Sequence, residues 1–367
     1  MNTLHLDTGP DWRGGQAQAL LLVRGLLARG HGAEIVAVRD TPLAKRAQDA
    51  GVRVHAVCPH FRRISMARML RGLLRDQNFD IIHAHEPHGL TAAWLAGVRR
   101  RASLVVSRRV AYPLSPGRAA MARYLAVRRI IAVSRYVAAS IVTCGLDPSR
   151  IAVVHDGVPV PPPCTTAERA AARARWGVAE SELLLGCVGY LLAEKGQEVL
   201  LHTLALLEER FPQCRLLLAG RGPYRGHLEL LARELRILDR IIFTGFVDDV
   251  DSVYAALDLF LFPSLAEPLG SSLLDAMARG IPVIAVASGG IPEILEDGKN
   301  GRMLVVGEPE AFAGAISRLL QNPPEAAILG AAGRATMRDR FTADHMTEAT
   351  LAVYSQTLSE AGSQPKK

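Results

Sequence analysis

Short runs of Val, Ile and Leu alternate with amphipathic stretches along the whole chain. Continuous apolar strands separated by helices are typical of a parallel sheet that is covered on both faces. In the first half the strand-like runs are residues 3–6, 33–38, 52–57, 80–85, 102–107, 129–133 and 151–154. The stretches with helical spacing include residues 16–29, 66–75, 90–98 and 135–144.

The same alternation restarts in the second half, with strand-like runs at residues 183–189, 214–219, 240–244, 257–262, 282–286 and 302–305. Residues 158–163 between the halves read Val-Pro-Val-Pro-Pro-Pro, and proline fixes φ and lacks an N–H, which predicts a stiff linker. We therefore expect one domain over residues 1–160 and a second over residues 161–341. A C-terminal helix at about residues 342–358 should pack back on the first domain, with a short tail to residue 367.

This pattern predicts two Rossmann-like, doubly wound α/β domains. Ligands of open parallel sheets bind beyond the carboxyl ends of the strands, so functional residues are expected in the loops that follow strands.

Composition excludes several classes of protein. No apolar run approaches the roughly 18 residues that span a bilayer, because Arg24 and Gly25 interrupt the longest candidate. The first residues lack the basic and apolar regions of a signal peptide, so we expect a cytoplasmic protein. The five cysteines are widely spaced and contain no CxxC, which indicates reduced thiols and not a disulfide or zinc framework.

Charge is distributed unevenly. Residues 1–160 contain 23 lysines and arginines and 10 acidic residues, a net charge of +13, whereas residues 161–367 contain 20 and 26, a net charge of −6. A basic half favours an anionic partner. No nucleic-acid motif is present there and aromatic residues are sparse, so an anionic membrane surface, glycan or lipid is the better interpretation and nucleic acid is not expected.

The most informative motif follows the run at residues 257–262. Glu267 lies in a loop, Gly270 opens a predicted helix, and Ser271 and Ser272 provide N–H groups at the helix start, where anions bind. Asp275 lies just over one turn inside the same helix.

Three further strand–helix turns have related features. Lys195 follows Gly189 and the run at residues 183–189, in a position to meet phosphate as a point charge. Gly15 follows the first strand and Gly222 follows the run at 214–219, and glycine lets backbone approach a ligand closely. Neither turn matches GxGxxG with an acid about 20 residues later, which disfavours a nicotinamide dehydrogenase.

These blocks together resemble the retaining glycosyltransferases of family 4, which have the GT-B fold. The family motif of an acid, a glycine and a second acid, followed by A-M-A-x-G-x-P-V-I-A, is similar to residues 267–285. Residues 217–223, 244–247, 259–264 and 289–294 match further blocks in the same order. The resemblance implies two Rossmann-like domains with an interdomain cleft that binds a nucleotide-sugar.

The resemblance also implies roles for residues at matching positions. Glu267 matches the acid on the donor sugar, and Asp275 matches the acid on the ribose. Lys195 matches the lysine on the donor diphosphate, beside the Ser271 and Ser272 N–H groups, and Gly15 matches the glycine that closes over the phosphates. The implied mechanism is transfer with retention of configuration, without a cofactor and without a metal.

Three positions depart from the family pattern. Tyr190 stands where many members have an arginine, and Asp275 is one methylene shorter than the usual glutamate. Arg108 stands near the place of a histidine close to the acceptor, and the nearest histidines follow another strand, in the segment that contains His85. We interpret this segment as the lining of a sugar site, with a metal site as the alternative. Asp249 and Asp251 resemble a DxD metal motif, but they precede a helix and are interpreted as caps.

We therefore expect a cytoplasmic glycosyltransferase of the hexosyltransferase class that moves a sugar to a glycan or lipid-linked acceptor in cell-envelope biosynthesis, such as that of lipopolysaccharide or exopolysaccharide. Arginines among apolar residues at 61–75 predict peripheral contact with the inner face of an anionic plasma membrane. A nucleotide-sugar 2-epimerase of the same fold is one alternative, which the pairing of Glu267 with Asp275 argues against. A catalytically silent GT-B binding module is another, which Tyr190 and Asp275 keep open.

Overall fold

The computed structural model describes residues 1–114, 117–305 and 307–362. The chain divides into two compact units, which are described separately here: unit 1 is Met1–Gly157 with Ala343–Lys367, and unit 2 is Val158–Thr342. The last helix of the chain thus belongs to unit 1. The short tail expected after it, residues 363–367, lies outside the described residues.

Unit 1 contains a seven-stranded parallel sheet in the order β3-β2-β1-β4-β5-β6-β7. Each predicted strand is present, with ends that shift by no more than one residue. The strands are β1 (Asn2–Asp7), β2 (Gly32–Val38), β3 (Arg53–Val57), β4 (Ile81–Ala84), β5 (Ser103–Arg108), β6 (Arg129–Ala132) and β7 (Ile151–Val153).

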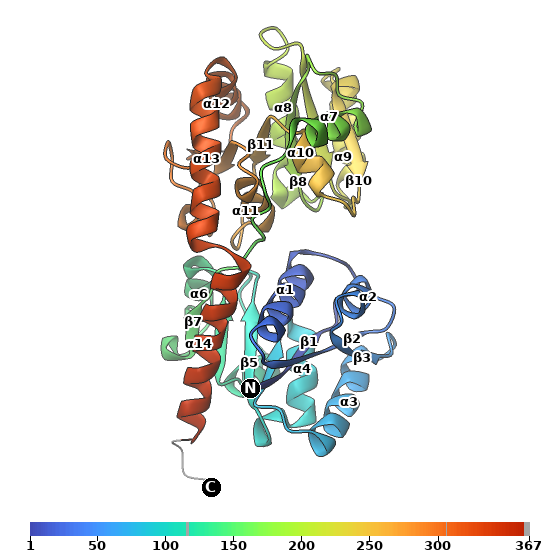
Figure 1. The fold of residues 1–367 in the computed structure, drawn as a ribbon, viewed down its shortest axis with the longest axis vertical. Coiled ribbons are helices and arrows are strands. Elements are labelled where there is room, and N and C mark those ends of the chain that lie inside the picture. The colour runs from blue at the N-terminus through green and yellow to red at the C-terminus, as the bar shows by residue number, and fades with distance from the viewer. Residues whose placement is uncertain (115–116, 306, 363–367) are drawn as a thin grey trace. The chain divides into compact units, whose positions relative to one another are not determined.

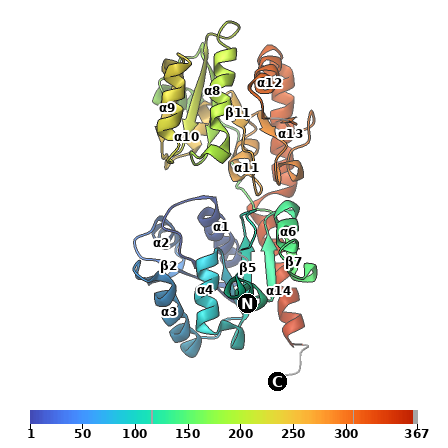
Figure 2. The same ribbon diagram turned by 180° about the vertical axis from the view of Figure 1, so that it is seen from behind.

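Helices cover both faces of this sheet (Figures 1 and 2). The helices are α1 (Gly14–Ala28), α2 (Pro42–Asp49), α3 (Arg62–Asp76), α4 (Pro87–Ala96), α5 (Arg118–Leu125), α6 (Arg135–Val142) and α14 (Ala343–Gly362). Helix α14 packs against α1. A Cβ at Gly25 of α1 would collide with the Thr347 side chain of α14, so glycine permits this close approach. Arg29, which directly follows α1, also pairs with Asp344 of α14 at 2.8 Å.

Unit 2 contains a six-stranded parallel sheet in the order β10-β9-β8-β11-β12-β13. The strands are β8 (Leu183–Val188), β9 (Cys214–Ala219), β10 (Ile241–Gly245), β11 (Leu259–Phe262), β12 (Val283–Val286) and β13 (Arg302–Leu304). The helices are α7 (Thr166–Arg175), α8 (Gln197–Leu206), α9 (Arg225–Glu234), α10 (Asp251–Ala256), α11 (Ser271–Ala278), α12 (Pro309–Gln321) and α13 (Pro323–Arg340).

Each sheet has one point at which the strand order reverses. It lies between β1 and β4 in unit 1 and between β8 and β11 in unit 2. The loops beyond such a point diverge to opposite faces of the sheet and leave room for a ligand. The prediction of two doubly wound parallel-sheet domains is confirmed. In the described part of the chain, no helix is both long and apolar enough to cross a membrane.

Candidate active site

The reversal point of unit 2 brings together the two residues to which the sequence assigned a catalytic role. Lys195 follows β8 and Glu267 follows β11, and the Lys195 Nζ lies 2.6 Å from the Glu267 Oε2. The Ser264 hydroxyl donates to the same carboxylate oxygen at 3.0 Å. The Glu267 side chain is 10% exposed and that of Lys195 is 26% exposed, so both groups remain within reach of a ligand.

Glycines hold the two loops in these positions. Gly196 has a φ of +68°, and a Cβ there would collide with the Pro263 carbonyl at the end of β11. The Leu265 N–H donates to the Glu194 carbonyl at 3.0 Å, which ties the loop after β11 to the loop after β8. The ion pair is therefore fixed by the backbone of both loops.

The start of α11 lies three residues beyond Glu267. Gly270 has a φ of +106°, which favours glycine, and a Cβ there would meet the Ile291 side chain at 2.9 Å. The first N–H groups of the helix, from Ser271 and Ser272, lack intrahelical acceptors and carry the positive end of the helix dipole. This helix start can bind an anion.

Asp275 lies on α11 and is joined to an arginine that the sequence analysis did not select. Arg279, one turn later, donates to the Asp275 carboxylate at 3.4 Å and to its carbonyl at 2.9 Å. Arg279 also pairs with Asp251 and lies over the Tyr254 ring. Burial raises the pKa of Asp275, while Arg279 opposes the rise. The i, i+4 spacing of Asp275 and Arg279 was the available signal for this pair.

Gly189 and Gly222 lie in the turns after β8 and β9. A Cβ at Gly222 would collide with the Leu191 carbonyl, so glycine is needed there for close packing of the two loops. At Gly189, by contrast, the Cβ direction is open, with nothing within 4 Å. Of these two glycines, Gly189 is the one with space for a ligand to approach.

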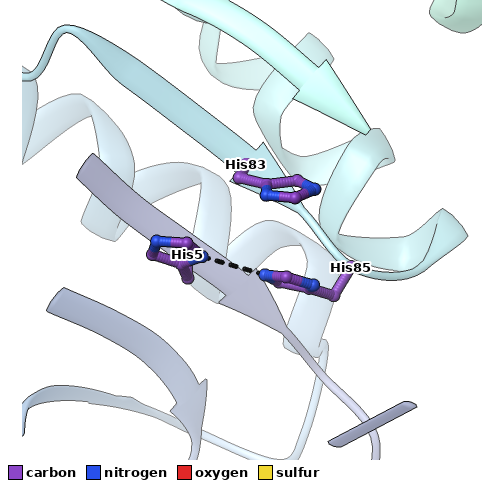
Figure 3. A group of neighbouring side chains, drawn as sticks. All are labelled: His5, His83 and His85. Carbon is purple, nitrogen blue, oxygen red and sulfur yellow. Dashed lines mark hydrogen bonds between the residues drawn. The ribbon is translucent and has the colours of Figure 1, made fainter. Parts of the chain in front are cut away.

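The reversal point of unit 1 holds Gly15 and His85. Gly15 is the second residue of α1 and its Cβ direction is open. His85 directly follows β4 and lies with His5 and His83 in a cluster of three buried imidazoles (Figure 3). The His85 Nε2 lies 2.9 Å from the His5 Nδ1. Their ring nitrogens are close enough to one another to be considered as metal ligands, which was the alternative interpretation of this segment.

The structure distinguishes two neighbouring arginines at the end of β5. The buried Arg108 donates to the Tyr112 carbonyl and, at 3.2 Å, to the Tyr124 hydroxyl, so it is held within unit 1. Arg109 instead lies 3.2 Å from the His85 Nδ1 and forms an ion pair with Asp156 at 2.9 Å. The arginine that contacts His85 is therefore Arg109, which the sequence did not single out as a site residue, whereas Arg108 remains a predicted substrate-binding residue.

The expected helix caps at Asp249 and Asp251 are not formed. The N-cap of α10 is Val250, and Asp251 is the first helical residue. The two carboxylates pair with arginines instead, Asp249 with Arg175 at 2.7 Å and Asp251 with Arg279. The cap prediction is therefore wrong, because long arginine side chains from other helices reach these acids.

Comparison with protein families identifies both units. The model for glycosyl transferases group 1 matches residues 168–336, and the model for glycosyltransferase family 4 matches residues 12–160. The chain belongs to glycosyltransferase family 4. The predicted family is thus confirmed.

Two curated relatives of this family 4 member are named for work on cell-envelope glycolipids. A GDP-mannose-dependent phosphatidylinositol monomannoside mannosyltransferase of Mycolicibacterium smegmatis is 34% identical over 45% of this chain. A lipopolysaccharide core biosynthesis glycosyltransferase, LpsE of Rhizobium meliloti, is 35% identical over 41% of this chain. The alignments span about half the length of these relatives, 46% and 44% respectively.

The fold is similar to that of Anabaena HepE, whose crystal structure contains UDP and glucose. The TM-score is 0.85 at 22% sequence identity, over 97% of this chain and 99% of HepE. This likeness shows that the family 4 member has the GT-B fold.

Proposed function

We propose that this protein is a retaining glycosyltransferase that moves a sugar from a nucleotide-sugar, bound by unit 2, to a glycan or lipid-linked acceptor, bound by unit 1. The observation that carries the proposal is the Lys195–Glu267 pair beside the start of α11. A cation, a carboxylate and a helix N-terminus at one reversal point match the needs of a diphosphate joined to a sugar.

Each group has a separate task in the transfer. The Lys195 ammonium and the α11 N–H groups neutralise the charge that develops on the departing diphosphate, so no metal ion is required for that task. The diphosphate draws Lys195 away from Glu267, whose carboxylate is then available to the hydroxyls of the donor sugar. Asp275 binds the ribose. The acceptor attacks from the face that the diphosphate leaves, which retains the configuration, and correct orientation supplies much of the rate.

The basic charge of residues 1–160 supports an anionic acceptor in cell-envelope biosynthesis. The names of the two curated relatives refer to a phosphatidylinositol monomannoside and to biosynthesis of the lipopolysaccharide core, and both are consistent with a glycolipid of this type. Arg63, Arg68 and Arg75 are exposed along helix α3, and Phe61 and Ile64 are exposed at its start. We propose that this surface lies against an anionic membrane at its cytoplasmic face, where a lipid-linked acceptor would be found.

The first test is thermal-shift screening against a panel of nucleotide-sugars. Binding at 100 times Kd stabilises the folded protein by about 2.7 kcal/mol, so a specific donor gives a clear shift in Tm. Slow release of nucleoside diphosphate from that donor without acceptor supports a transferase. Formation of an epimer without acceptor would indicate the 2-epimerase instead, and binding without any turnover would indicate a silent binding module.

A further inference from the structure

A row of buried polar side chains runs through unit 1 and ends at Arg109. The Thr3 hydroxyl lies 3.0 Å from the His5 Nε2, the His5 Nδ1 lies 2.9 Å from the His85 Nε2, and the His85 Nδ1 lies 3.2 Å from an Arg109 terminal nitrogen. The row crosses from β1 to the end of β4 and then to the residue after β5. It therefore starts inside the sheet, near the beginning of β1, and reaches the carboxyl edge at the reversal point only with His85 and Arg109.

The chemistry of the two ends fixes every proton in this row. A guanidinium carries only donors, so the His85 Nδ1 must accept from Arg109 and the proton of neutral His85 is on Nε2. That N–H donates to the His5 Nδ1, which places the His5 proton on Nε2, where it donates to Thr3. The Thr3 hydroxyl donates in turn to the Gly32 carbonyl at 3.1 Å. In each of these four hydrogen bonds the donor lies on the side of Arg109 and the acceptor on the side of Gly32.

Protonation of His5 or His85 would break a hydrogen bond of this row. A proton added to His85 would direct an N–H at a guanidinium N–H. Burial, followed by the charge of Arg109, lowers the pKa of His5 to about 3, and burial also holds the pKa of His85 well below its usual range. A metal ion on the His85 Nε2 would require an imidazolate, because Arg109 already occupies Nδ1. The row therefore favours neutral imidazoles over the metal site.

The Arg109 guanidinium has two hydrogen-bond partners and remains partly exposed to solvent. Its Nε donates to Asp156 at 2.9 Å while its terminal nitrogen donates to His85, and its side chain is 15% exposed. These two bonds use two of the five donors of a guanidinium and fix its plane. An arginine so oriented at a strand end is suited to an oxyanion, which it binds with parallel N–H groups.

We propose that Arg109 binds an oxyanion of the acceptor, a phosphate or carboxylate group, and that His85 and His5 are positioning residues that hold its guanidinium. The acceptor role rests on the proposed function, but oxyanion binding and the proton pattern of the histidines do not. The donor diphosphate is assigned to Lys195 and α11 of unit 2, so its affinity is independent of Arg109.

The experiment titrates the full chain, saturated with UDP, with inorganic phosphate and measures Kd by calorimetry for every variant; NMR of the Arg109 side-chain N–H locates the binding in the proteins that keep this residue. Arg109→Gln should weaken phosphate binding by at least tenfold. His85→Leu, which removes the acceptor at Nδ1, should weaken it about tenfold, whereas His85→Gln, which can still accept from Arg109 and donate to His5, should stay within threefold. Arg99→Gln, at an exposed arginine of unit 1, controls for net charge.

Each of the following results would overturn part of the proposal. Phosphate binding that survives Arg109→Gln would remove the oxyanion site, and phosphate binding that survives His85→Leu would remove the positioning role of His85. A loss of UDP affinity in Arg109→Gln would assign the arginine to the donor. Long-range ¹H–¹⁵N spectra should show both His5 and His85 neutral and protonated on Nε2 between pH 6 and 8; an Nδ1–H form of either would contradict the row. If the protein binds no nucleotide-sugar, the proposed function fails while the phosphate titration without UDP and the histidine spectra still decide this inference.

Discussion

The two units of this protein have reversal points of the same topology and opposite character. In unit 2 the strand ends carry a lysine and a glutamate whose charged atoms lie 2.6 Å apart. In unit 1 the same region carries the buried imidazoles of His5 and His85, a buried Asp7, and Arg109, which is held by Asp156. Similar strand orders therefore present different chemistry, because the residues at and near the strand ends differ.

The difference follows from what each unit is proposed to bind. Negative charge develops on the departing diphosphate during the reaction, so an ionic group such as Lys195 that is already in place beside it stabilises the transition state. An acceptor must be held without change while it attacks, and a rigid row of hydrogen bonds suits that task.

The largest expected effect tests the charge in unit 2. Glu267→Gln keeps the shape and removes the charge that meets the sugar as positive charge develops on it, so kcat should fall by 10²-fold or more. Ser264→Ala is the matched control, since it removes a neutral donor to the same oxygen and should cost only a few-fold. Steady-state kinetics on correctly folded variants decide the matter, and full turnover by Glu267→Gln would remove the basis of the assigned site.

The buried carboxyl of unit 1 should give a pH dependence of stability. Burial raises the pKa of Asp7 from 3.8 to about 6. The folded chain therefore keeps a proton that the unfolded chain has released, so the stability from this group is greatest below pH 3.8 and declines as the pH rises to 6. Asp7→Asn removes this decline. Relative to wild type, the free energy of unfolding of the variant should therefore rise by up to about 3 kcal/mol between pH 4 and pH 7.

Hydrogen exchange of the β1 amides measures this stability for unit 1 alone. The quantity to compare is the difference in the free energy of unfolding between variant and wild type at each pH. The contribution of the histidines cancels in this difference. A difference that is the same at pH 4 and pH 7 would show that Asp7 titrates normally in the folded chain.

Removal of the cation in unit 2 should have a somewhat smaller effect. Lys195→Ala should lower kcat/KM for the donor by about 30-fold, because the lysine acts on both the bound and the departing diphosphate. Lys299→Ala, at an exposed lysine of unit 2 paired with Glu296, is the control and should be close to wild type. Unchanged kcat/KM in Lys195→Ala would separate this residue from the diphosphate.

Asp275 should affect binding more than turnover. A contact to ribose is the same before and during the reaction, so Asp275→Asn should raise KM for the donor by about tenfold with little change in kcat. Asp275→Glu, which restores the usual length of the family residue, should be tolerated or should lower KM. A fall in kcat with KM unchanged would place Asp275 near the reacting atoms instead.

The smallest expected effect concerns the surface of α3. Each arginine near an anionic leaflet contributes about 1 kcal/mol, so Arg68→Gln and Arg75→Gln should each reduce sedimentation with anionic vesicles about fivefold at low salt. Arg233→Gln, at an exposed position on α9 in unit 2, should have no effect. Failure of the wild-type protein to bind such vesicles would leave the membrane contact without support.

The sequence alone determined the positions of the strands along the chain and the loops that carry the unit 2 site. Apolar runs and helical spacing are local signals, and the rule that ligands bind at the carboxyl ends of parallel strands then selects the loops with Lys195, Glu267 and Gly270. The observed strand ends lie within one or two residues of the predicted ones, because the buried runs are bounded by polar residues, glycine or proline.

The tertiary structure decided which side chains meet. His5 and His85 are 80 residues apart, and only the pairing of β1 with β4 brings their rings together. Arg108 and Arg109 are neighbours in sequence, but successive side chains at a strand end point to opposite faces, so one is tied to Tyr112 and Tyr124 while the other joins His85. Arg279 reaches Asp251 across two helices, which no spacing along the chain predicts. Side-chain partners depend on packing between distant segments, and that is why local patterns located the site without fixing its contacts.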